Sequence, residues 1–150
     1  MTLRAHIIQS LVISVVLFPF LGVDTVIFFV SAVLIDIDHY LDYVFICRRF
    51  SVRGMFRFHD FIAKNIKLVY GLSIFHTVDV FLILFVFGFW NYRFWIVLCG
   101  FLVHFIFDCY NLYKRNYIFS RAFSIFEYIL KSKNSKAYPI PPEAFWDVKK

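Results

Sequence analysis

The chain has 150 residues, of which 61% are hydrophobic, and a mean hydropathy of +0.73. Soluble domains are only about 45–50% apolar, and a chain this short cannot bury such an excess in one core, so a wholly soluble fold is excluded. The net charge of +6 accompanies no nucleic-acid-binding motif, so we expect the basic residues to meet anionic lipid head groups and not nucleic acid.

Four segments approach the roughly 20 residues that a membrane-spanning helix needs. In chain order they cover residues 5–21, 25–47, 68–90 and 94–113. The first is read as a retained helix and not a signal peptide, because no small-x-small cleavage site precedes Asp24 and a second apolar segment follows at once. Asp24 itself is expected to be only the N-cap of the second helix. Short links at 22–24 and 91–93 predict antiparallel neighbours.

Lysine and arginine are unequally distributed between the links. Of the 16 basic residues, all but Arg93 lie in the N-terminus, the 48–67 loop or the tail. The positive-inside rule places these parts in the cytoplasm. The chain is therefore predicted to be an all-α integral membrane protein, with a four-helix membrane domain at 1–113 and a basic cytoplasmic tail at 114–150.

Two further stretches predict amphipathic helices that lie in the head-group plane. They cover 55–66 in the basic loop and about 118–130 in the tail, where Arg121 falls outside the apolar stripe. The alternative is that these are ordinary surface helices packed on other protein. The three cysteines, Cys47, Cys99 and Cys109, lack the spacing of a disulfide framework or zinc ribbon, and are expected to be reduced and buried.

Histidine and aspartate recur together within the predicted spans. Asp36, Asp38 and Asp42 flank His39, Asp79 follows His76 at i+3, and Asp108 follows His104 at i+4. Ionisable groups in hydrocarbon cost a few kcal/mol each, so these should be paired, hydrated or metal-bound. The topology, which was fixed from lysine and arginine alone, places all of them and His6 at one depth near the cytoplasmic face.

Imidazole and carboxylate together suit zinc, and also manganese or iron. The predicted metal ligands are His6, Asp38, His39, His76, His104 and Asp108. Asp36, Asp42 and Asp79 are expected to orient ligands or act as general base. So many ligands allow two or more metal ions, an arrangement suited to phosphoester hydrolysis. For His59 and Asp60, a solvated loop pair and a role at the site both stay open.

At these residues the sequence resembles the YdjM-like family of LexA-regulated inner-membrane proteins, described as metal-dependent hydrolases. The matching motifs are Ala5-His6, residues 34–39 with Ile35 in place of the usual proline, Phe75-His76-Thr77, and the closely similar 100–108. A His-Arg element is missing, and only His59-Asp60 stands in that part of the chain. The family is distantly similar to zinc-dependent phospholipases C and single-strand nucleases, so the resemblance implies an all-helical zinc phosphoesterase in a bacterial inner membrane.

The leading hypothesis is a membrane-embedded metal-dependent hydrolase, a phosphoesterase acting on a lipid or lipid-linked head group, with the bilayer as its partner. Two alternatives stay open. The same residues could form a metal-ion or proton pathway in a transporter, although no inverted repeat is visible. They could also join helices in a non-catalytic subunit of a membrane complex. Metal content separates this last alternative from the other two.

Overall fold

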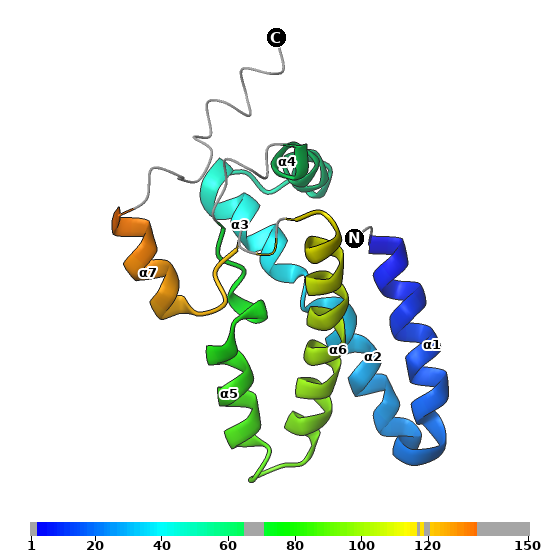
Figure 1. Cartoon of the computed structure of the whole chain (residues 1–150). Helices are drawn as coiled ribbons and strands as arrows, with labels where there is room; N and C mark the ends of the chain where they lie inside the picture. The colour runs from blue at the N-terminus through cyan, green and yellow to red at the C-terminus, as the bar shows by residue number, and fades with distance from the viewer. Residues whose placement is uncertain (1–2, 65–70, 117, 119–120, 135–150) are drawn as a thin grey trace.

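The computed structural model describes residues 3–64, 71–116, 118 and 121–134. Every regular element in these ranges is helical, apart from an isolated bridge between Gly71 and Arg121, so the all-α prediction is confirmed. The α-helices are α1 (Leu3–Leu21), α2 (Thr25–Leu34), α3 (Ile37–Cys47), α4 (Val52–Lys64), α5 (Val78–Phe87), α6 (Arg93–Lys114) and α7 (Ile125–Asn134). Two 3₁₀ turns, η1 (Gly22–Asp24) and η3 (Ile74–His76), precede α2 and α5. Figure 1 shows their arrangement.

Two helical segments are long and apolar enough to cross a membrane, Arg4–Cys47 and Arg93–Lys114. The first turns back through η1, where Gly22 adopts a positive φ of 53°, so α1 and α2 lie antiparallel (Figure 1). The predicted third span differs from the structure. Its helix, α5, begins only at Val78 because Thr77 is extended and forms the N-cap. Residues 68–70 of that span lie outside the described ranges.

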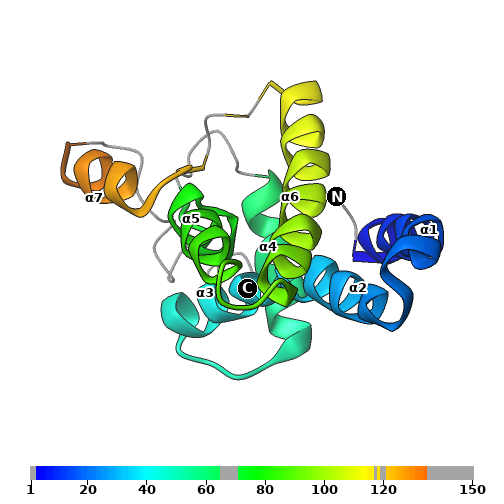
Figure 2. The same cartoon turned by 90° about the horizontal axis from the view of Figure 1, so that it is seen from below.

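Helices α2 and α6 approach closely because Gly100 has no side chain. A Cβ atom at Gly100 would lie 2.2 Å from Ser31 Oγ and 2.8 Å from the carbonyl oxygen of Phe28. Real Cβ atoms do not come so near to backbone, so this contact requires glycine. The two helices lie side by side in Figure 2. His104 follows one turn along α6, where the close packing brings its ring to the backbone of α2.

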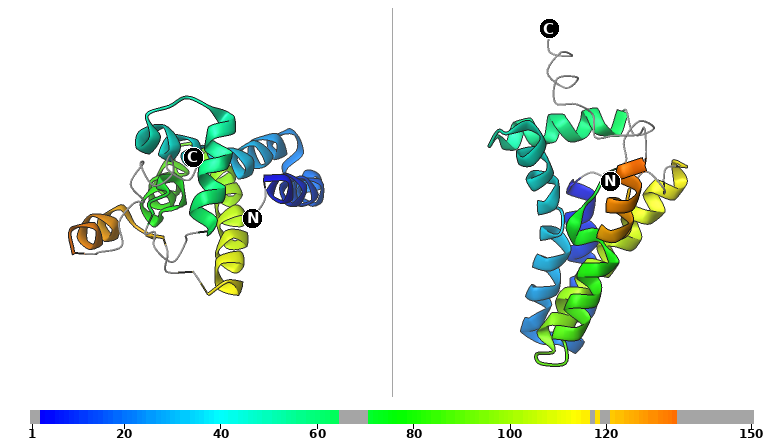
Figure 3. Two further views of the ribbon diagram at one scale, coloured as in Figure 1. Left: turned by 90° about the horizontal axis from the view of Figure 1, so that it is seen from above. Right: turned by 90° about the vertical axis from the view of Figure 1, so that its left-hand side faces the viewer.

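The predicted helix in the basic loop is present as α4. Its apolar face packs on α3 in a small core of Tyr43, Cys47 and Phe58, and Arg53 and Arg57 are exposed. Figure 3 shows α4 lying across one end of the bundle formed by α1, α2, α5 and α6. The packing on α3 agrees with the alternative of a helix packed on protein, and a location in the head-group plane stays a prediction.

Three sequence expectations need correction. The predicted tail helix of 118–130 begins only at Ile125, because the segment 121–123 pairs instead with another part of the backbone. Its Ala122 N–H donates to the Gly71 carbonyl at 2.9 Å, and its Phe123 carbonyl accepts from Val78 N–H at 2.9 Å. Asp24 occupies the N-cap position of α2 without a side-chain capping bond.

The cysteines provide the third correction. All three are free thiols, as expected. Cys47 is buried and Cys109 is half-buried, but Cys99 is exposed on α6. The chain has more apolar residues than its core can hold, so an apolar residue such as Cys99 can lie on the outer face of α6.

Candidate metal centre

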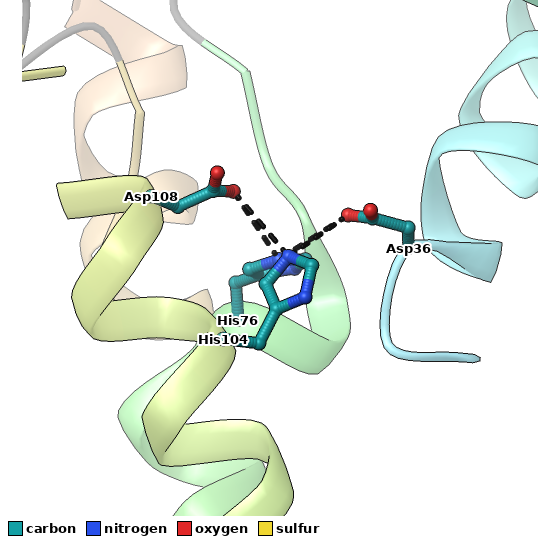
Figure 4. A group of neighbouring side chains, drawn as sticks. All are labelled: Asp36, His76, His104 and Asp108. Atoms are coloured by element: carbon teal, nitrogen blue, oxygen red, sulfur yellow. Dashed lines mark ion pairs between the residues drawn. The ribbon is translucent and has the colours of Figure 1, made fainter. Parts of the chain in front are cut away.

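Four side chains from three parts of the chain converge beside the upper half of α6 (Figure 4). Asp36 comes from the break between α2 and α3, His76 from the end of η3, and His104 and Asp108 from successive turns of α6. Each offers one nitrogen or oxygen atom, and these four atoms lie within 4.8 Å of one another. The described group has the composition of a metal site, two imidazoles and two carboxylates.

The separations between these atoms fit a common cation. Asp36 Oδ1 lies 3.2 Å from His104 Nε2 and 3.8 Å from His76 Nε2. Asp108 Oδ2 lies 3.7 Å from each of the same two nitrogens. Ligands about 2.1 Å from a tetrahedral ion would be roughly 3.4 Å apart. Most of these distances are too long for direct hydrogen bonds but suit atoms that share an ion.

Hydrogen bonds at the opposite ring nitrogens orient both imidazoles. His104 Nδ1 lies 2.8 Å from the carbonyl oxygen of Ala32 and His76 Nδ1 lies 2.9 Å from Asp38 Oδ2. Since a carbonyl and a carboxylate only accept, both Nδ1 atoms carry hydrogen. A ring that is neutral and bonded in this way presents the lone pair of Nε2 to the group, as a metal ligand does.

Three of the four converging atoms are buried and unsatisfied. His76 and His104 are 0% and 2% exposed. Their Nε2 atoms and Asp36 Oδ1 have no hydrogen-bond partner. Buried polar atoms are almost always satisfied in folded proteins, and a buried carboxylate without a compensating charge is costly. A divalent cation would satisfy all three atoms, so the donor set fits a metal ion.

Asp36 and Asp38 differ from their predicted roles. Asp36 was expected to orient the ligands, yet its Oδ1 belongs to the converging group. Asp38 was expected to be a ligand, yet its Oδ2 accepts from His76 Nδ1 and from the Phe75 N–H at 3.2 Å. The interruption between α2 and α3 explains the difference. Asp36 lies in the link between the two helices, whereas Asp38 lies in the first turn of α3.

His6 and His39 flank the group. His6 Nε2 lies 3.3 Å from Asp108 Oδ1, and its ring stacks on that of His104 with centroids 4.0 Å apart. His39 Nε2 lies 3.3 Å from Asp36 Oδ1. The His39 side chain is 31% exposed, whereas that of His6 is 5% exposed. Of the two flanking rings, that of His39 is therefore the nearer to the surface.

His59 supports His39 from α4. Its Nε2 lies 3.0 Å from the His39 carbonyl oxygen, and the two rings have centroids 4.4 Å apart. Burial lowers the pKa of His59 from its ordinary value, which favours the neutral ring that donates this bond. His59 is thus attached to the site through its neighbour, and Asp60 is exposed.

Two predicted residues are not brought into the group. Asp79 accepts from Ile125 N–H at 2.8 Å and from Ser124 Oγ at 3.4 Å, so it fixes the start of α7. The expected i,i+3 pair with His76 does not form because η3 ends before α5 begins. Asp42 is half-buried on α3 and interacts electrostatically with Asp38 and Arg121.

Arg121 is the residue that the sequence reasoning missed. Its Nη1 lies 3.7 Å from Asp108 Oδ2, and it is only 9% exposed. Helical periodicity had placed it on the polar side of a tail helix. The available signal was weak: Arg121 has no basic neighbour within a mostly apolar stretch, whereas the other basic residues of the tail are mostly clustered.

No family model, curated protein or solved structure matches the chain. What the residues themselves define is an all-helical protein with two helical segments of membrane-spanning length and a buried His/Asp group that could hold a metal ion.

Proposed function

We propose that the protein is a membrane-embedded metal-dependent hydrolase, a phosphoesterase that acts on a lipid or lipid-linked head group. The observation that carries this proposal is a convergence of four side chains. The Nε2 atoms of His76 and His104 lack hydrogen bonds and lie close to Asp36 and Asp108, while the opposite nitrogen of each ring is hydrogen-bonded. Zinc is the proposed ion because nitrogen and carboxylate ligands at tetrahedral separations suit it. The family resemblance of residues 5–111 supports the same class of reaction.

A divalent cation bound here would act as a Lewis acid that promotes deprotonation of water and stabilises charge on a phosphoryl oxygen. The chain's own residues provide the rest. Asp38 and the Ala32 carbonyl hold the two ligating rings in one tautomer. His6 holds Asp108. Of the four site histidines, His39 has the most exposed side chain, so it is placed to accept a proton from water and pass it to solvent.

The surface of the helices supports a membrane location. Large apolar side chains are exposed along α1, α2, α5 and α6, including Val15, Phe20, Val26, Leu82 and Ile106. Such continuous apolar surface is incompatible with water as the only solvent, and lipid would cover it. Basic α4 crosses the bundle end on the side of the site (Figure 3). Its arginines would there meet anionic head groups, which contain the phosphoesters to be cleaved.

The orientation is tested by labelling single engineered cysteines in a cysteine-free background. A site near Tyr92 should react with an impermeant reagent in intact cells, and a site near Lys133 should not, because the basic side faces the cytoplasm. Equal labelling at Lys133 would contradict the topology and the access of cytoplasmic head groups to the site.

The activity is tested by release of water-soluble phosphate product from anionic lipid vesicles. Wild type should release product only when loaded with metal, and His104→Ala should be inactive. Asp24→Asn is the control because Asp24 lies in the turn before α2, at the far end of the bundle (Figure 1). Full activity in folded His104→Ala would refute the site. Metal uptake into liposomes without any hydrolysis would instead favour a transporter.

A further inference from the structure

Arg121 has hydrogen-bonding capacity that the described structure leaves unused. A guanidinium group carries five N–H donors. The Nε and Nη2 atoms of Arg121 are buried and have no hydrogen-bond acceptor. Among the described residues its ion pair joins Nη1 to Asp108 Oδ2 at 3.7 Å, which is longer than a hydrogen bond. A buried charged donor without an acceptor is costly, so these donors indicate a ligand.

The position of Arg121 identifies what such a ligand would contact. The Asp108 Oδ2 atom that pairs with Arg121 is the same atom that lies 3.7 Å from His76 Nε2 and from His104 Nε2. The guanidinium and the candidate metal position are therefore both next to this one carboxylate oxygen. A molecule that reached both the ion and Arg121 would bridge two positive charges, so it would be an anion.

The backbone fixes Arg121 in this place. The Ala122 N–H donates to the Gly71 carbonyl at 2.9 Å, and the Val78 N–H donates to the Phe123 carbonyl at 2.9 Å. The segment that carries Arg121 is thereby joined to the segment that carries His76. The guanidinium carbon also lies 5.6 Å from the ring centroid of Phe105, a favourable cation–π contact. Arg121 is thus held in place before any ligand arrives.

We infer that Arg121 is a substrate-binding residue that holds a non-bridging phosphoryl oxygen beside the metal. Planar guanidinium donors match two oxygens of one phosphate, which a lysine ammonium cannot do in the same way. This inference rests on the proposed function, since it assumes a metal at the His/Asp group. It adds that the substrate must present an anionic group next to the bond that is cleaved, so neutral esters would be poor substrates.

The test is binding of inorganic phosphate to full-length, metal-loaded protein, measured by calorimetry. Arg121→Gln should keep its metal but bind phosphate about 10- to 100-fold more weakly, the loss expected for charge-assisted hydrogen bonds. Arg121→Lys, which keeps the positive charge beside Asp108, should show a smaller loss. Arg93→Gln is the matched control: the Arg93 side chain is exposed and pairs with Asp24, and phosphate affinity should not change.

Metal content and melting temperature are measured on each variant. Unchanged phosphate affinity in whichever Arg121 variant keeps its fold and metal overturns the inference but leaves the proposed function intact. Loss of the metal from folded Arg121→Gln would show that Arg121 serves Asp108 alone, and also overturns it. A wild type that binds no metal overturns both proposals.

Discussion

Two polar clusters of the described residues can be compared, one in the turns at the end of the bundle that holds η1 and one beside the upper half of α6. They differ in how exposed their members are and in whether their polar atoms form hydrogen bonds. In the turn cluster, Asp24 accepts from the Tyr92 hydroxyl and pairs with Arg93 Nε at 3.5 Å. Tyr92 and Arg93 are exposed and Asp24 is half-buried, and together they join the η1 turn to the link before α6. In the His/Asp group the two histidine Nε2 atoms and Asp36 Oδ1 are buried and lack hydrogen bonds. Both clusters connect helices, but of the two it is the His/Asp group that leaves these buried atoms unsatisfied.

This contrast separates a structural role from a binding role. An exposed ion pair contributes little to stability, because water solvates both charges almost as well. A buried carboxylate and two oriented lone pairs are unfavourable in the absence of a cation. Substituting an aspartate is therefore expected to have different effects at the two clusters, and each cluster can serve as the control for the other.

The largest difference should appear in metal affinity. Asp108→Asn removes a charged ligand and should weaken metal binding about 100-fold or more, because neutral amides are poor ligands for zinc. Asp24→Asn, the same substitution in the turn cluster, should leave the affinity unchanged. Competition against a chromophoric chelator measures both variants. Equal affinities would mean that Asp108 is no ligand.

Metal removal should destabilise the protein through the buried cluster only. A ligand at 100 times its dissociation constant stabilises the native state by about 2.7 kcal/mol. Chelation should therefore lower the melting temperature of wild type and Asp24→Asn by similar amounts. Asp108→Asn should respond much less to chelation. A melting temperature that is insensitive to verified metal removal would favour helix-joining hydrogen bonds.

The close contact of α2 and α6 gives a third prediction. Gly100→Ala should destabilise the protein by about 1–3 kcal/mol, since the added methyl meets Ser31 Oγ and the Phe28 carbonyl. It should also weaken metal binding, because the His104 ring would move away from Ala32. Gly71→Ala is the matched control, with nothing within 4 Å of the added Cβ. If thermal unfolding shows equal stability for both variants, the α2–α6 packing is not as tight as described.

The smallest effect is expected for Tyr92→Phe. This variant removes the hydroxyl that donates to Asp24 at an exposed site, so the loss of stability should be under about 1 kcal/mol. Metal affinity should be unchanged, because Tyr92 precedes α6 and the site lies near its other end. A marked change in metal affinity would show that the two clusters are energetically coupled.

Local patterns in the sequence predicted the parts of the structure that depend on local geometry. Helical spacing within α6 places His104 and Asp108 on one face, and basic-residue asymmetry placed the other His/Asp motifs at the same level. The structure brings His6, Asp36 and His76 to that level as well.

The remaining features depend on long-range backbone contacts, which periodicity does not report. Asp36, and not Asp38, lies in the converging group because the helix is interrupted between α2 and α3. Asp79 bonds to the start of α7 because the segment before α7 is hydrogen-bonded to Gly71 and Val78. That same pairing buried Arg121, which the pattern had placed on an exposed helix face.

The most direct test of the account is metal analysis of detergent-purified protein prepared without chelators. Elemental analysis should find at least one divalent ion per wild-type chain, and the same content in Asp24→Asn. The double variant His104→Ala, Asp108→Asn should be folded and metal-free, since it loses two of the four converging ligands. A metal-free wild type, or equal metal in the folded double variant, would contradict the assignment of the buried cluster as a metal centre.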